Sequence, residues 1–191
     1  VDDGKPTYSF EGIISYAAAT IAWLVNQLEL IDDPTETEAL ANSVDDNGGV
    51  YLVPAFAGLS APYWSRSARA AIVGMTAHST KSHVVRAALE SIAYQIRDVL
   101  DMMKTGAGVT PKRIHADGGA AQNQFLMQFI ADIVELDVHV SKDPEFSALG
   151  ATFAGTLGMG VYSSFDDLTG LPGESKIYSP QLDEERRRTL Y

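Results

Sequence analysis

One stretch of the sequence, from Ile114 to Leu126, limits the possible folds of this chain more than any other. A short apolar run ends at Asp117-Gly118-Gly119, and a helix with amide side chains in its first turn follows. Glycine lets the backbone turn sharply and lets another molecule approach closely. The helix start offers unpaired N–H groups and the positive end of a dipole. The stretch predicts a strand, a turn and a helix where a nucleotide can lie; a tight turn without a ligand is the alternative.

Strands alternate with helices along the rest of the chain. Short apolar runs predict buried strands, and apolar residues at helical spacing predict amphipathic helices. The strands are expected at 50–53, 70–75, 113–116 and 138–141, and the helices at 13–31, 82–103, 122–136 and 147–159. This alternation is typical of a layered α/β domain. We expect these strands to share one sheet, with the second and third helices packed against it.

Several connecting segments carry predictions of their own. A short helix and a turn are expected at 32–49, and the aromatic and proline-rich segment 54–64 predicts a rigid structured loop. The helix at 82–103 has Thr80 or Ser82 as its expected N-cap. Glu90 is expected at the border of that helix as a solvated or paired charge. The Gly- and Ala-rich helix 147–159 is expected to lie close against a sheet.

Composition bounds the class of protein. At 191 residues the chain has the size of one domain, with 46% hydrophobic and 20% charged residues. A net charge of -11 argues against nucleic-acid binding, which needs a basic face. The absence of cysteine excludes disulfides and thiolate metal sites. Neither a membrane span nor a signal peptide is recognisable, so we expect a cytoplasmic domain. A start without methionine is expected for a piece of a longer protein.

Several familiar chemistries have no motif here. There is no G-x-x-x-x-G-K-[ST] sequence, and Gly106-Ala107-Gly108 lacks the third glycine of a dinucleotide fingerprint. His115 beside Asp117 could be an acid–base pair, or a core-edge imidazole and a turn acid. The histidines are scattered without metal-ligand spacing: His78, His83, His115 and His139.

Further motifs accompany the Gly-Gly turn at a distinctive spacing. They are Val-Pro-Ala-Phe-Ala-Gly-Leu-Ser-Ala-Pro-Tyr-Trp at 53–64, Ala-Ala-Ile-Val-Gly-Met-Thr at 70–76, His-Val-Val-Arg-Ala-Ala-Leu-Glu-Ser-Ile-Ala at 83–93 and Ala-Leu-Gly-Ala at 148–151. With these motifs, from about Tyr8 to Tyr178, the chain resembles the C-terminal domain of the FGGY family of carbohydrate kinases. The resemblance implies an α/β, actin-like (ribonuclease H-like) ATPase domain with a mixed sheet flanked by helices. That domain would span 1–178, with a truncated helix start at 179–191.

The resemblance also implies an activity. The chain would be the ATP-binding domain of a kinase that transfers the γ-phosphate of ATP to a polyol hydroxyl, with Mg²⁺ in the complete enzyme. Glycerol is the expected acceptor; a pentulose or another polyol is the alternative, and a non-catalytic actin-like module also stays open. The catalytic aspartate and the polyol pocket would lie in an N-terminal domain that this chain lacks. No catalytic residue or metal ligand is therefore expected here. That domain, ATP or ADP, the polyol and a second copy of the protein are the expected partners.

The family pattern assigns roles to individual positions. By resemblance, Gly119 packs on the nucleotide and Asn123 lies by the adenine. Where the family has a nucleotide-contacting glycine and glutamine, this chain has Ala18 and Ala22, and Ala22 cannot form a hydrogen bond through its side chain. Close helix packing is the alternative reading of the alanines at 17–19. The expected nucleotide-binding residues are Gly118, Gly119, Ala120, Asn123, Ala18 and Ala22.

Overall fold

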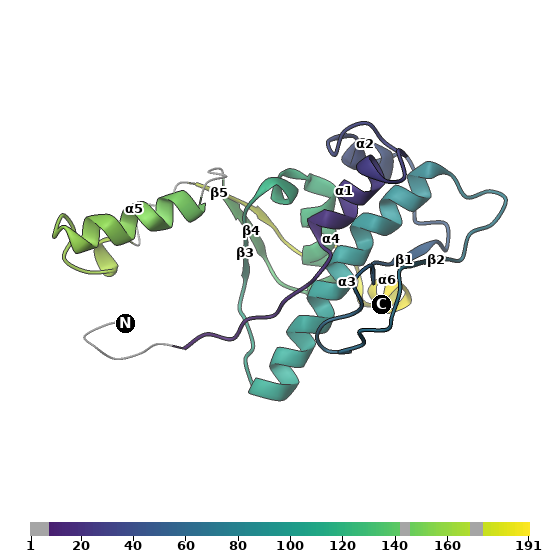
Figure 1. Cartoon of the computed structure of the whole chain (residues 1–191). Helices are drawn as coiled ribbons and strands as arrows, with labels where there is room; N and C mark the ends of the chain where they lie inside the picture. Colours follow the sequence, from purple (N-terminus) through teal and green to yellow (C-terminus); the bar gives the residue numbers. More distant parts are fainter. Residues whose placement is uncertain (1–7, 142–145, 169–173) are drawn as a thin grey trace. The chain divides into compact units, whose positions relative to one another are not determined.

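The structure is a computed structural model that describes residues 8–141, 146–168 and 174–191 (Figure 1). Its contacts divide the chain into two compact units, Val1–Pro111 and Lys112–Tyr191. The predicted polar start at the N-terminus and the predicted loop at Pro172-Gly173 lie mainly or wholly outside the described residues. Each unit is described by itself below.

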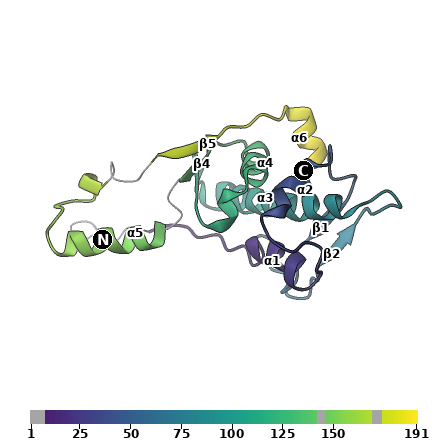
Figure 2. The same cartoon turned by 90° about the horizontal axis from the view of Figure 1, so that it is seen from above.

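The first unit is built around one long helix. Its elements are α1 (Ala18–Asn26), α2 (Glu36–Asn42), β1 (Tyr51–Val53), β2 (Ala71–Val73) and α3 (Lys81–Ala107). Helices α1 and α2 and strand β1 all pack against α3 (Figures 1 and 2). The core between them contains Leu24, Val50, Leu52 and Val85, all buried. Strands β1 and β2 form an antiparallel ribbon with Tyr51 opposite Val73.

Local sequence explains both ends of α3. The helix begins after Thr80, whose backbone N–H donates to Nδ1 of His83 at 3.1 Å. It ends at Gly108, which has a φ of 66° and so takes the left-handed conformation that glycine adopts without penalty. Apolar residues at helical spacing, among them Leu89 and Ile92, are buried as predicted. The N-cap expected at Thr80 or Ser82 is therefore Thr80.

The second unit contains a mixed sheet. Its elements are β3 (Ile114–Ala116), η1 (Gly119–Gln122), α4 (Gln124–Val134), β4 (Val138–Ser141), α5 (Phe146–Gly158), η2 (Asp166–Leu168), β5 (Ser175–Tyr178) and α6 (Glu184–Leu190). Strand β3 runs parallel to β4, and β4 runs antiparallel to β5. Helix α4 packs against β4 and β5. Its predicted apolar face is buried: Leu126, Phe129, Ile130 and Ile133.

A buried carboxylate ties the C-terminal segment to α4. Oδ1 of Asp132 accepts hydrogen bonds from the backbone N–H groups of Gln181 at 2.6 Å and Leu182 at 3.2 Å. Arg187 of α6 adds an ion pair with Glu135, 3.2 Å apart. These contacts hold the segment that contains α6, which the sequence predicted only as a helix start.

The prediction of one shared sheet is wrong. The described strands form a two-stranded sheet, β1-β2, and a three-stranded sheet, β3-β4-β5. Periodicity reports which residues are buried but not which strand edges pair, and pairing needs contacts between distant parts of the chain. Strand β5 was not predicted, because only Tyr178 of its residues is buried and no apolar pattern marks it. The prediction of an α/β fold with a mixed sheet is confirmed.

Two helix predictions need correction. The helix expected at 13–31 is only α1, because Glu29 takes a positive φ of 50° and the residues before Ala18 form a loop. The Gly- and Ala-rich side of α5 is exposed, and a Cβ at Gly150 or Gly155 would meet no atom within 4 Å. The expected close packing of this helix on a sheet is therefore wrong for the described residues.

Candidate functional site

The Gly-Gly turn follows β3 directly, as predicted. Gly118 has φ 85° and ψ 177°, a backbone conformation that is essentially restricted to glycine. Gly119 has no positive φ, and a Cβ at this position would meet no atom within 4 Å. The fold of this unit therefore requires glycine at 118 but not at 119. The exposed backbone at Gly119 can be approached closely by another molecule.

The residues after the turn are held by a helix cap. Oδ1 of Asn123 accepts the backbone N–H of Leu126 at 2.9 Å, and the backbone of Asn123 closes the short helix η1 on Ala120 at 3.2 Å. Ala121 is buried and anchors η1, whereas Ala120 is half-buried. The cap fixes the direction of the Asn123 side chain. Four of the predicted residues thus lie in one short segment that ends in a helix cap: Gly118, Gly119, Ala120 and Asn123.

Ala18 and Ala22 lie in the other unit, on α1. Both are exposed, and they are one helical turn apart, so they share one side of the helix. Thr20, Ile21 and Leu24 are the buried residues of α1. Because Ala18 is exposed, the alternative prediction, that the alanines at 17–19 are small to allow close helix packing, is not supported at Ala18 within this unit. Within the first unit, Ala18 and Ala22 therefore form one small exposed surface on α1.

The structured loop predicted at 54–64 holds α1. The ring of Phe56 lies between Tyr16 and Trp23, with centroid distances of 4.8 Å and 4.7 Å. The hydroxyl of Tyr63 donates to Oδ2 of Asp98 on α3 at 3.0 Å. Partial burial, together with this carboxylate, raises the pKa of Tyr63. The prediction of a rigid loop is consistent with these contacts.

Glu90 lies in the core of the first unit rather than at a helix border. Its carboxylate accepts from Nε of Arg86 at 2.8 Å, from Nδ2 of Asn47 at 2.9 Å and from the hydroxyl of Tyr94 at 3.4 Å. Only 1% of Glu90 is exposed. Burial raises the pKa of Glu90, although Arg86 and the other donors act in the opposite direction. Of the two predicted alternatives, the paired charge is confirmed and the solvated charge is wrong. The predicted place at the helix border is also wrong.

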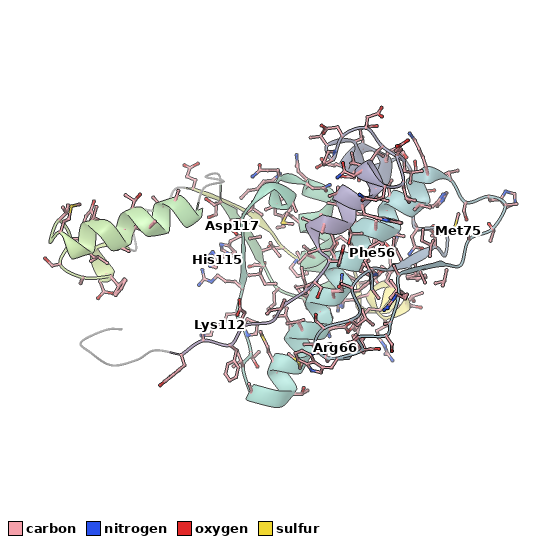
Figure 3. The ribbon with its side chains drawn as sticks, in the orientation of Figure 1. Phe56, Arg66, Met75, Lys112, His115 and Asp117 are labelled. Atoms are coloured by element: carbon pink, nitrogen blue, oxygen red, sulfur yellow. The ribbon has the colours of Figure 1, made fainter. Side chains whose placement is uncertain are left out.

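Sequence reasoning missed a polar hollow beside the turn. It has a volume of about 280 Å³ and is lined by His115, Ala116, Asp117, His139, Ser141 and Ser175. Figure 3 shows His115 and Asp117 following one another along β3 and its continuation. His115 is exposed, so the prediction of a core-edge imidazole is wrong. A signal for this hollow was present in the sequence: a histidine is the second residue of each of two short strands, 114–116 and 138–141.

The described residues contain neither a metal-binding cluster of three side chains nor a membrane-spanning helix. Within 8–141, 146–168 and 174–191, no group of three or more His, Asp or Glu side chains is arranged to hold a metal ion. Among the described residues, none of the helices combines the length and the apolar character that a membrane crossing needs.

A strand, a glycine turn with exposed backbone and a capped helix follow one another in this α/β unit. The model of the FGGY family of carbohydrate kinases, C-terminal domain, matches residues 1–159. The chain belongs to this family of carbohydrate kinases, to which it contributes a C-terminal domain.

Individual relatives agree with this assignment. The glycerol kinase of Shewanella amazonensis is 47% identical over 190 residues, which cover 100% of this chain and 38% of that protein. The glycerol kinase of Vibrio cholerae is 44% identical over 188 residues, which cover 98% of this chain and 37% of that protein. The chain thus spans little more than a third of the length of the curated relatives it matches.

Solved structures show the fold. The crystal structure of Plasmodium falciparum glycerol kinase with ADP aligns with a TM-score of 0.81 and 35% identity, over 90% of this chain and 34% of that one. The xylulose kinase of Rhodospirillum rubrum aligns with a TM-score of 0.72 and 27% identity, over 91% of this chain and 36% of that one. The predicted actin-like ATPase fold is confirmed.

Proposed function

We propose that this chain is the ATP-binding domain of a kinase that phosphorylates glycerol. The curated relatives at 44–47% identity are glycerol kinases, and one of the similar solved structures is a glycerol kinase with ADP. The observation that carries the proposal is the bare backbone of Gly119. The fold of its own unit does not require glycine there, and the exposed backbone leaves room for a ligand.

The residues of the turn would bind and orient the nucleotide. Gly119 allows the nucleotide to lie directly on the main chain, and Gly118 provides the turn that makes this backbone accessible. Asn123, held in one direction by its cap, would lie beside the adenine end. Bound ATP would supply the phosphoryl group. The contribution of this chain to phosphoryl transfer is positioning.

The chemical step needs groups from elsewhere in the protein. We expect an aspartate of the N-terminal domain to accept the proton of the polyol hydroxyl. Mg²⁺ would accompany ATP, and the described part of this chain offers no cluster of ligands for it. The proposed partners are the N-terminal domain, the polyol bound through that domain and a second copy of the protein. The cytoplasm stays the predicted location.

Ala18 and Ala22 stay proposed nucleotide-binding positions by family resemblance, and an alanine makes a weaker contact there than a glutamine would. Both lie where a bound molecule could reach α1, and neither has a polar side-chain atom. This favours one second candidate, a non-catalytic nucleotide-binding module that has lost the amide contact.

Kinetics of the intact protein test the proposal. ADP formation would be measured with glycerol, xylulose and other polyols over a range of ATP concentrations, alongside calorimetric titration with ATP. Glycerol-dependent turnover together with ATP binding supports the proposal. A preference for a pentulose would refute the proposed substrate, and ATP binding without turnover on any polyol would establish the non-catalytic module.

A further inference from the structure

Two histidines face each other across the parallel strands of the second unit. His115 of β3 and His139 of β4 are direct partners in the strand register. Their ring centroids are 5.2 Å apart, with the ring planes at 44°. Val138 and Val140 are buried on the side of β4 that meets α4. Because side chains alternate along a strand, His139 and its partner His115 lie on the opposite side of the sheet.

Both rings line the same open hollow, and its chemistry favours a cation. The remaining side chains of the lining are Ala116, the carboxylate of Asp117 and the hydroxyls of Ser141 and Ser175. No lysine or arginine is among these described lining residues. The net charge of the chain, -11, also favours a cation over an anion.

The separation of the rings matches a shared metal ion. With a metal–nitrogen bond of about 2.0–2.1 Å, the centre of an imidazole lies about 3.2 Å from the ion, so two rings at angles of about 90–109° have centres about 4.5–5.2 Å apart. The observed centroid distance of 5.2 Å lies at the tetrahedral end of this range. The strand register holds the two rings side by side, so rotation about their side-chain bonds can bring a nitrogen of each ring to one ion.

We propose that His115 and His139 bind a divalent transition-metal ion that prefers imidazole, such as Cu²⁺, Ni²⁺ or Zn²⁺. Two imidazoles are the protein ligands, since no third metal-binding side chain is arranged around them in the described residues. Water completes the coordination. A site of two neutral nitrogens takes Cu²⁺ in preference to Ni²⁺ and Zn²⁺ and does not take Mg²⁺, which prefers oxygen. The argument for this metal site does not rest on the proposed nucleotide site.

Metal titration of the intact protein tests this site. We expect calorimetry to detect one site that binds Cu²⁺ more tightly than Ni²⁺ or Zn²⁺, with no binding of Mg²⁺. His115→Ala and His139→Ala should each lower Cu²⁺ affinity by about tenfold or more, since even groups that merely orient a metal ligand contribute that much. His78→Ala is the matched control, because His78 is exposed in the first unit and should leave the affinity unchanged.

Spectroscopy gives a second, independent result. The paramagnetic resonance spectrum of the Cu²⁺ complex should show two nitrogen ligands, and one fewer in either variant. Circular dichroism and thermal melting establish whether the variants are folded. If an alanine variant is unfolded, the corresponding glutamine variant, His115→Gln or His139→Gln, takes its place. The proposal is overturned if folded variants of both histidines bind Cu²⁺ as tightly as the wild-type protein, since the ion would then be held elsewhere.

Discussion

At the scale of single residues, adjacent glycines have different roles. Gly118 takes a φ of 85° and a ψ of 177°, which side-chain-bearing residues avoid, so the fold needs glycine there. Gly119 has no such backbone requirement and faces open space. A substitution at 119 can therefore report on ligand binding, whereas one at 118 reports on folding.

Gly119→Val should weaken ATP binding without unfolding the protein. The valine side chain would occupy the volume proposed for the nucleotide, so we expect the ATP KM to rise by at least about tenfold, equivalent to about 1.4 kcal/mol of lost binding. The polyol KM should be nearly unchanged. Steady-state kinetics of the intact enzyme and a melting curve provide the measurements, with the smaller Gly119→Ala change as an intermediate case.

Gly118→Ala is the control for this experiment. Forcing alanine into the observed backbone conformation should cost about 1–3 kcal/mol of folding free energy. A folded Gly119→Val protein with the wild-type ATP KM would show that the turn has no nucleotide contact.

Glu90 should make stability depend on pH in a specific direction. Burial raises the pKa of this carboxyl, so the folded state binds a proton more tightly than the unfolded chain. Its contribution to stability is therefore greatest at low pH and is lost as the pH rises from the ordinary glutamate pKa, about 4.3, through the raised folded value. Relative to Glu90→Gln, the wild-type protein should lose free energy of unfolding over this window.

Urea unfolding of both proteins at several pH values between about 4 and 7 measures this difference. Glu11→Gln, which alters an exposed carboxyl, is the control and should follow the wild-type profile. A wild-type protein that gains stability relative to Glu90→Gln as the pH rises would contradict the assignment, because attraction to Arg86 would then outweigh burial.

At the scale of elements, the loop at 54–64 decides where α1 lies. Phe56 contacts Tyr16, just before the helix, and Trp23 within it. Helix α1 has nine residues and has neither an acidic first turn nor a basic last turn. A helix this short is marginal without tertiary contacts, so its stability depends on the loop and on α3.

Phe56→Ala should loosen α1. A fully buried phenylalanine contributes about 3–5 kcal/mol, and for this half-buried ring we expect a loss of about 2 kcal/mol. Hydrogen exchange of the amides in α1 should accelerate more than that of α4. Trp64→Ala in the same loop is the matched control, since its ring is 74% exposed, and it should change stability by no more than about 0.5 kcal/mol. Equal exchange in α1 for both variants would rule out Phe56 as the anchor.

At the scale of the whole molecule, the chain corresponds to only part of the length of its curated relatives. It covers 38% of the Shewanella amazonensis glycerol kinase. By the proposed mechanism, the polyol and the acid–base aspartate are held elsewhere. Phosphoryl transfer depends on the combined positioning of both reactants, so neither part is expected to suffice.

The 191-residue chain by itself should show no polyol kinase activity. A coupled assay for ADP release with saturating glycerol and ATP would be compared with the intact enzyme at equal concentration. Circular dichroism would establish that the isolated chain is folded. Glycerol-dependent ADP formation by the purified chain would refute the proposed division of roles between the two domains.

The sequence by itself determined the features that depend on neighbouring residues. Helical spacing identified the apolar faces of α3 and α4, and the Asp-Gly-Gly pattern located the turn after β3 with Asn123 behind it. These succeed because backbone conformation and amphipathic character are local properties. The family motifs at 53–93 and 117–123 likewise led to the correct family and fold.

Tertiary structure decided everything that depends on which distant segments meet. Only the folded chain shows that β1 pairs with β2, that β5 joins β4, and that Glu90 is buried with Asn47 as a hydrogen-bond partner. His115 and His139 lie opposite each other because of the register between β3 and β4. The sequence of neither strand specifies that register. The physical reason is the same in each case. A side chain's burial and partners depend on long-range packing, whereas its periodicity reflects only its own segment.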